Sequence, residues 1–148
     1  MYKHSLIATD GSELARKGVD HGLALAARLG ARVTILTVTH PMRPEAIRAA
    51  QLAGIDDPVV RYDQQIDAEM EAQFAQLREE AHRHGAEVDL VHEIDDYPAE
   101  AIIRVANLRG CDLIVMTSHG RRGARRLILG SQTAEVVTHT TLPVLVIR

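Results

Sequence analysis

The chain has 148 residues, of which 46% are hydrophobic and 25% charged, as in an ordinary globular protein with one core. A formal net charge of −3 and an aromatic content of 3% argue against a surface for nucleic acid or anionic membranes. The single cysteine, Cys111, excludes an internal disulfide, and no apolar run reaches the roughly 20 residues of a membrane span. Because no signal-peptide pattern follows Met1, we expect a cytoplasmic protein with one domain over residues 1–148.

The first quarter of the sequence predicts a strand, a helix and a second strand. Ser5 to Ala8 is a short apolar run, and Ser12 after it is of a residue type that caps helices. Apolar residues then recur at helical spacing, namely at Ala15, Val19, Leu23 and Ala26. Gly18 and Gly22 lie beside them, and since glycine weakens a helix, we expect them to allow close packing on a sheet. Arg32 to Val38 is rich in β-branched residues and predicts the second strand.

Residues 40–63 are the least regular part of the sequence, and three prolines and one glycine interrupt them. Within them, Pro44 to Leu52 fits a short helix with proline at its first position. We expect this long connection to be irregular and mobile. A clear amphipathic helix follows, with an apolar stripe at Ile66, Met70, Phe74, Leu77 and Ala81.

The second half continues the alternation of strands and helices. Its predicted strands are Glu87 to Ile94, Leu113 to Met116 and Val144 to Ile147. One helix begins at Pro98, and the last begins at Gly130-Ser131 with Ala134, Val137 and, less cleanly, Val136 on its apolar side. This alternation predicts an α/β fold in which parallel strands are joined by right-handed crossovers, with helices on both faces of the sheet. Alternation alone leaves the strand order open.

Two small polar segments stand out near the C-terminus. Thr117 to Gly120 follows the apolar fourth strand, and Gly130-Ser131 precedes the last helix. Small residues at a helix start leave backbone N–H groups that converge on one point, which favours an anion. The sequence therefore predicts an anion site at the start of the last helix.

These segments resemble the nucleotide-binding signature of the universal stress protein family: glycine, two residues, glycine, nine residues, and glycine followed by serine or threonine. Here Gly120 is the second glycine, residues 121–129 are the spacer, and Gly130-Ser131 closes the pattern. Thr117 replaces the first glycine. The N-terminal LIATDGSELA and the C-terminal LPVLVIR extend the resemblance over the whole chain. It implies a single doubly wound domain with a five-stranded parallel sheet of order 3-2-1-4-5.

That order implies a ligand crevice at the carboxyl ends of the first and fourth strands, where the winding reverses. By resemblance, the adenine side consists of Ala8, Thr9 and Val38 with Met116 beneath, and the phosphate side of Gly120, Gly130, Ser131 and the backbone N–H of Gln132. Asp10 follows the first strand, and from the residues alone it fits a ligand contact and a cap of the first helix equally well. The resemblance favours the ligand contact. Thr117 in place of glycine is expected to strain the loop or crowd a ribose.

The loop between the two segments carries several cationic residues: His119, Arg121, Arg122, Arg125 and Arg126. They fit phosphate contacts and a solvated loop, and for most of the arginines we favour the solvated loop. No set of residues predicts a protein-bound metal.

The resemblance implies a nucleotide-binding regulatory module of a stress response, which holds ATP with Mg²⁺ and at most hydrolyses it slowly. No Walker A lysine motif, G-x-G-x-x-G turn or nucleophile elbow is present. A receiver domain is disfavoured, because no lysine follows the last strand. The alternative is an interaction protein of the same fold that binds no nucleotide. In both cases the apolar last strand, Val144 to Ile147, predicts a homodimer through a sheet edge.

Overall fold

The computed structural model describes residues 1–118 and 129–148. Its strands and helices alternate along the chain, apart from two consecutive helices after the second strand. The elements are β1 (His4–Ala8), α1 (Glu13–Leu29), β2 (Arg32–Thr39), α2 (Pro44–Leu52), α3 (Pro58–His84), β3 (Val88–Ile94), α4 (Pro98–Leu108), β4 (Leu113–Thr117), α5 (Ser131–His139) and β5 (Val144–Ile147). In the described residues, no helix is long and apolar enough to cross a membrane.

The five strands form one sheet in the order β3-β2-β1-β4-β5, and every neighbouring pair is parallel. Strand β1 lies in the middle, where Ile7 pairs with Ile35 of β2 on one side and with Val115 of β4 on the other. The predicted order and the reversal of winding between β1 and β4 are therefore confirmed. The carboxyl ends of these two strands meet at the same edge of the sheet.

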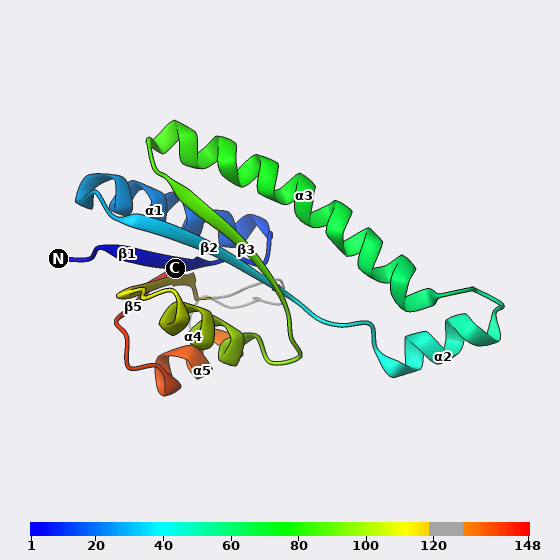
Figure 1. Cartoon of the computed structure of the whole chain (residues 1–148). Coiled ribbons are helices and arrows are strands. Elements are labelled where there is room, and N and C mark those ends of the chain that lie inside the picture. Colours follow the sequence, from blue (N-terminus) through cyan, green and yellow to red (C-terminus); the bar gives the residue numbers. More distant parts are fainter. Residues whose placement is uncertain (119–128) are drawn as a thin grey trace.

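Helices cover both faces of the sheet, as predicted (Figure 1). On one face α1 and α3 pack over a cluster that includes Ile7, Val115 and Leu77. On the other face α4 and α5 pack over a second cluster that includes Leu6, Met116 and Val136. Successive residues of a strand alternate between these two clusters, because side chains of a strand point to opposite faces.

The glycines of α1 allow close packing, as expected from the sequence. A Cβ atom built on Gly22 would lie 2.6 Å from Cδ1 of Ile7, which is fully buried. A Cβ on Gly18 would lie 2.9 Å from Cγ2 of Thr117. Both distances are shorter than an ordinary carbon–carbon contact of about 3.5–4.0 Å. A larger residue at either position therefore requires its neighbour on the sheet to move.

The connection expected to be irregular is largely helical. The short helix predicted over Pro44–Leu52 is present as α2 and contributes no buried residue. Helix α3 begins at Pro58, well before the start of the predicted stripe, because proline at the first helical position initiates a helix and does not interrupt it. In Figure 1, α2 and the first turns of α3 extend away from the sheet. The hydroxyl of Tyr62 donates to the carbonyl of His40 at 2.8 Å, which links this helical arm to the end of β2.

Helix α5 presents a different valine to the core from the one favoured by the sequence. Val136 is fully buried, whereas Val137 is 46% exposed. Thr133, one turn before Val136, is also buried, so the inward face runs through residues 133 and 136. In such a short helix the positions of two adjacent valines do not identify the buried face.

Candidate functional site

Two segments leave the sheet at the point where the winding reverses. Beyond β1, the N–H of Thr9 continues the ladder by donating to the carbonyl of Leu36 at 2.9 Å. Beyond β4, the N–H of Ser118 donates to the carbonyl of Ile147 at 2.8 Å. Since β1 and β4 are neighbours, Thr9 after β1 and Ser118 after β4 lie along the same edge. The predicted convergence is therefore confirmed for the described part of the second segment, Thr117 and Ser118.

Three residues predicted for an adenine site lie on the same face of the sheet. Met116 is 6% exposed and belongs to the core cluster under α4 and α5. Ala8 and Val38 are partly buried and pack against that same cluster. They come from three neighbouring strands, and Val136 of α5 lies in the cluster too. The carboxyl edge thus has an apolar floor next to the last helix.

Asp10 shapes the turn between β1 and α1. Its Oδ1 accepts a hydrogen bond from the N–H of Ser12 at 2.9 Å, and Oγ1 of Thr9 accepts from the N–H of Gly11 at 3.2 Å. Gly11 has a φ of 78°, in the left-handed region that glycine adopts without strain. Oγ of Ser12 then accepts from the N–H of Ala15 at 3.1 Å and caps α1, as predicted. Asp10 therefore has a structural role in this turn, although the residue that caps α1 is Ser12.

Backbone and side-chain bonds attach the start of α5 to the end of β4. The N–H of Gly130 donates to the carbonyl of Ser118 at 2.6 Å, and Oγ1 of Thr133 donates to the carbonyl of Thr117 at 2.8 Å. The amide of Gly130 is thus already engaged, contrary to the expectation that it would be available to an anion. The next amides, those of Ser131 and Gln132, belong to the first helical turn and have no acceptor within the helix.

The side chain of Gln132 has a role that sequence reasoning missed. Its Oε1 accepts a hydrogen bond from the N–H of Ala99 at 3.1 Å, in the first turn of α4. Helix α4 has no side-chain cap of its own at Tyr97, and Pro98 carries no N–H. Gln132 therefore joins the N-termini of α4 and α5 through its side chain.

Thr117 does not show the backbone strain expected of a threonine in the glycine position. It extends β4 by one residue and pairs with Ile147 of β5. Among the described non-glycine residues only Asp57 has a positive φ, so the backbone of Thr117 is unstrained. Its methyl group Cγ2 points toward Gly18 of α1, on the face opposite to Ala8 and Met116. The expected strain was wrong because the strand simply continues, with the methyl directed away from the apolar floor.

The remaining predicted phosphate residue, Gly120, lies outside the described residues. So do His119 and the four arginines of the loop, Arg121, Arg122, Arg125 and Arg126. In the described part of the chain, no group of three or more His, Cys, Asp or Glu side chains is arranged to hold a metal ion.

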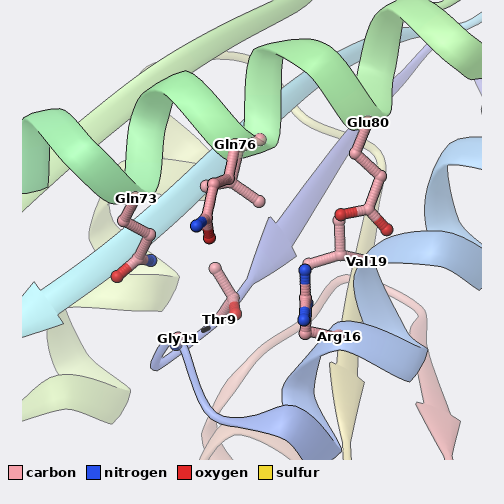
Figure 2. A pocket seen from close by; sticks show the side chains of 8 residues that line it. Thr9, Gly11, Arg16, Val19, Gln73, Gln76 and Glu80 are labelled. Carbon is pink, nitrogen blue, oxygen red and sulfur yellow. Dashed lines mark hydrogen bonds between the residues drawn. The ribbon is translucent and has the colours of Figure 1, made fainter.

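Behind the Asp10 turn, on the α1–α3 face, lies a small cavity of about 30 Å³ (Figure 2). Gln73 and Gln76 of α3 line it from one side and Thr9 and Gly11 from the other. It has room for water but not for a nucleotide, since ligand sites typically measure about 300–1,000 Å³. Sequence reasoning missed Gln73, although a polar residue on an otherwise apolar helix stripe was a signal.

Among the described residues, the groups with shifted pKa values lie at the other end of the strands. Burial raises the pKa of the Cys111 thiol to about 11, which agrees with an inert cysteine. Desolvation alone would raise the pKa of Asp112, but N–H groups of Lys3 and His4 donate to its carboxylate and lower the pKa overall. Burial, followed by the charge of Arg32, lowers the pKa of His4. These shifts belong to the amino-terminal edge and not to the candidate site.

The sequence of the chain matches one known protein family over its whole length. The sequence model of the Universal stress protein family matches residues 1–148. The chain belongs to the universal stress protein family. The universal stress protein YxiE of Bacillus subtilis is 30% identical over 151 aligned residues, covering 100% of both chains. A second relative from the same organism is the stress response protein NhaX, so both YxiE and NhaX are named for a stress response.

Solved structures of stress proteins share the whole fold. The structure of MJ0577, a universal stress protein of Methanocaldococcus jannaschii, is 26% identical with a TM-score of 0.81, covering 99% of this chain and 96% of that one. A universal stress protein in complex with cAMP is 22% identical with a TM-score of 0.72, covering 99% and 97%. A third, from Archaeoglobus fulgidus in complex with dAMP, is 17% identical with a TM-score of 0.68, covering 99% and 98%. At these identities the last two show the likeness of fold alone.

Proposed function

We propose that this stress protein binds an adenine nucleotide, ATP with Mg²⁺, at the carboxyl edge of β1 and β4. The observation that carries the proposal is the apolar floor of Ala8, Val38 and Met116 next to the N-terminus of α5. An adenine ring fits an apolar surface, and phosphates fit the amides of a first helical turn, where the helix dipole favours anions. Two structural neighbours are complexes with cAMP and dAMP, both adenine nucleotides, which supports the choice of base.

The residues present are compatible with such a ligand. Ser131 offers a hydroxyl and an N–H at the start of α5, and Gln132 offers an N–H while its side chain is held by Ala99. Mg²⁺ usually binds through one or two carboxylates together with phosphates and water, so it needs no dedicated cage of protein ligands. Asp10 provides a carboxylate at this edge, and when bound the ion would neutralise phosphate charge.

The proposed activity is regulation by binding. We propose that the chain holds ATP, hydrolyses it at most slowly, and acts through ligand-dependent shape or choice of partner. A ligand that binds only the folded state at 100 times its Kd adds about 2.7 kcal/mol of stability. For a domain of this size that corresponds to a rise in Tm of roughly 6–10 °C.

Isothermal titration calorimetry with ATP, ADP, AMP and GTP in the presence of Mg²⁺, together with thermal shifts, tests the proposal. Val38→Asp places a charge on the apolar floor and should abolish binding. Val137→Asp is the matched control, because Val137 lies exposed on the outer side of α5. The proposal fails if wild type gives no heat and no thermal shift with millimolar ATP, which would favour an interaction protein without nucleotide.

We further propose that the protein is a homodimer through β5. Strand β5 is the last in the sheet order, and all four of its residues are half-buried in the single chain. An apolar strand edge has unpaired backbone groups that a second copy can satisfy. Val146→Lys should convert a dimer into a monomer in light scattering at micromolar concentration, whereas Val137→Lys should not. A monomeric wild type would contradict this proposal.

A further inference from the structure

Gln73 is a polar residue on the buried side of α3. It lies one turn after Met70 and one turn before Leu77, and both of these are buried against the sheet. Its Nε2 donates a hydrogen bond at 2.9 Å to Oγ1 of Thr37, which is 2% exposed. Thr37 lies near the carboxyl end of β2, one residue before Val38 of the apolar floor. The amide of Gln73 is therefore fixed in orientation by a buried partner.

The other side of the same amide lies against the Asp10 turn. A Cβ built on Gly11 would lie 2.7 Å from Oε1 and 3.2 Å from Cδ of Gln73. Figure 2 shows Gln73 above Thr9 and Gly11, with Gln76 beside it on α3. The side-chain amide of Gln73 thus lies beside the turn, and a side chain on residue 11 would have to displace it.

This contact is on the reverse side of the candidate site. Ala8 and Val38 belong to the floor on the α4–α5 face, whereas Gln73 reaches the turn from the α1–α3 face. Gln73 therefore lies on the opposite face of the sheet from the apolar floor. We propose that it is a positioning residue, which supports the Asp10 turn from behind and keeps it in the conformation that receives a nucleotide. The ligand part of this inference rests on the proposed function.

The physical reason is preorganisation. The turn contains a glycine at a φ of 78°, so its backbone has wide conformational freedom unless neighbours restrict it. Two amides report whether it is ordered: the N–H of Gly11, bonded to Thr9, and the N–H of Ser12, bonded to Asp10. If the turn is already ordered before binding, less conformational entropy is lost when the ligand binds, and the affinity is higher.

Two variants test the inference, each with a readout that needs no ligand. Gln73→Leu removes the amide, and Thr37→Val removes the partner that orients it with little change in shape. Gln76→Leu is the control, since Gln76 lines the same cavity but is exposed. In ligand-free protein, hydrogen exchange of the Gly11 and Ser12 amides should become roughly tenfold faster in both variants and stay unchanged in the control. The Kd for ATP should rise roughly threefold to tenfold by calorimetry at a temperature well below the Tm.

The outcomes separate this inference from the proposed function. A merely structural Gln73 would lower the Tm, yet leave exchange in the turn and the Kd at their wild-type values; that result overturns the inference while nucleotide binding stands. If wild type binds no nucleotide but the variants loosen the turn, the supporting role holds and the proposed function fails. Unchanged exchange in both variants rejects the supporting role, whatever the affinity.

Discussion

Replacing Gly18 by alanine should lower the free energy of unfolding. When one methyl group is removed from Thr117, the same replacement should raise it. In a helix interior, glycine to alanine normally stabilises by about 1 kcal/mol. Here the new Cβ would lie 2.9 Å from Cγ2 of Thr117, whereas the backbone N of Thr117 is 3.7 Å away, an ordinary contact. Overpacking of this kind costs about 1–3 kcal/mol, so the net effect of Gly18→Ala is a loss of about 1 kcal/mol.

Thr117→Ser removes Cγ2 and keeps the hydroxyl, so it removes the closest contact alone. In that background, Gly18→Ala should add about 1 kcal/mol of stability, which makes the coupling between the two sites about 2 kcal/mol. Urea denaturation of the four proteins measures this, with midpoint shifts of about 0.5 M in opposite directions for a slope near 2 kcal/mol/M. Equal effects of Gly18→Ala in both backgrounds, within about 0.5 kcal/mol, would refute the packing of Thr117 against α1. They would also reopen the possibility that its methyl crowds the nucleotide crevice.

Three further outcomes follow from other parts of the structure. In urea denaturation, Val136→Ala should reduce the free energy of unfolding by roughly 2 kcal/mol, and Val137→Ala by less than about 0.5 kcal/mol. Equal losses in the two variants would contradict the orientation of α5. Because burial and Arg32 lower the pKa of His4, the histidine of the unfolded chain is protonated before that of the folded protein as the pH falls. The contribution of His4 to the free energy of unfolding is therefore full above about pH 6.5 and decreases as the pH drops below it. His4→Gln should flatten that decrease, and an unchanged pH profile would exclude His4 as its source. Cys111, 5% exposed and with a pKa raised to about 11, should react with a thiol reagent at pH 8 only after unfolding. Rapid reaction of the native protein would show that the connection between α4 and β4 opens.

Much of the architecture could be predicted from the sequence because its signals are local. The apolar run from Leu113 to Met116 and the capping residue Ser12 each act over a few residues, and both were confirmed. The apolar pattern does not show where α3 begins, because a proline in an irregular stretch suggests an interruption, although proline suits a first helical position. The choice between Val136 and Val137 depends on which face of a short helix meets the sheet, which no local pattern specifies.

The candidate site was only partly predictable, for a different physical reason. Its residues were identified through the family signature, but their bonds join segments that are far apart in the sequence. Thr117 packs on Gly18, Gln132 caps α4 at Ala99, and Gln73 meets Gly11 and Thr37. Such pairings depend on how the helices lie on the sheet, so the sequence showed which residues were present but not which partners they had.

The most direct test of nucleotide binding at the β1–β4 edge is an NMR titration of the ¹⁵N-labelled protein with ATP and Mg²⁺. Saturable shifts are expected for the amides of Asp10, Val38 and Ser131, while those of Val88 and Asp89, at the opposite end of the sheet, stay in place. Absence of any shift at millimolar ATP, or shifts confined to Val88 and Asp89, would contradict the proposed site.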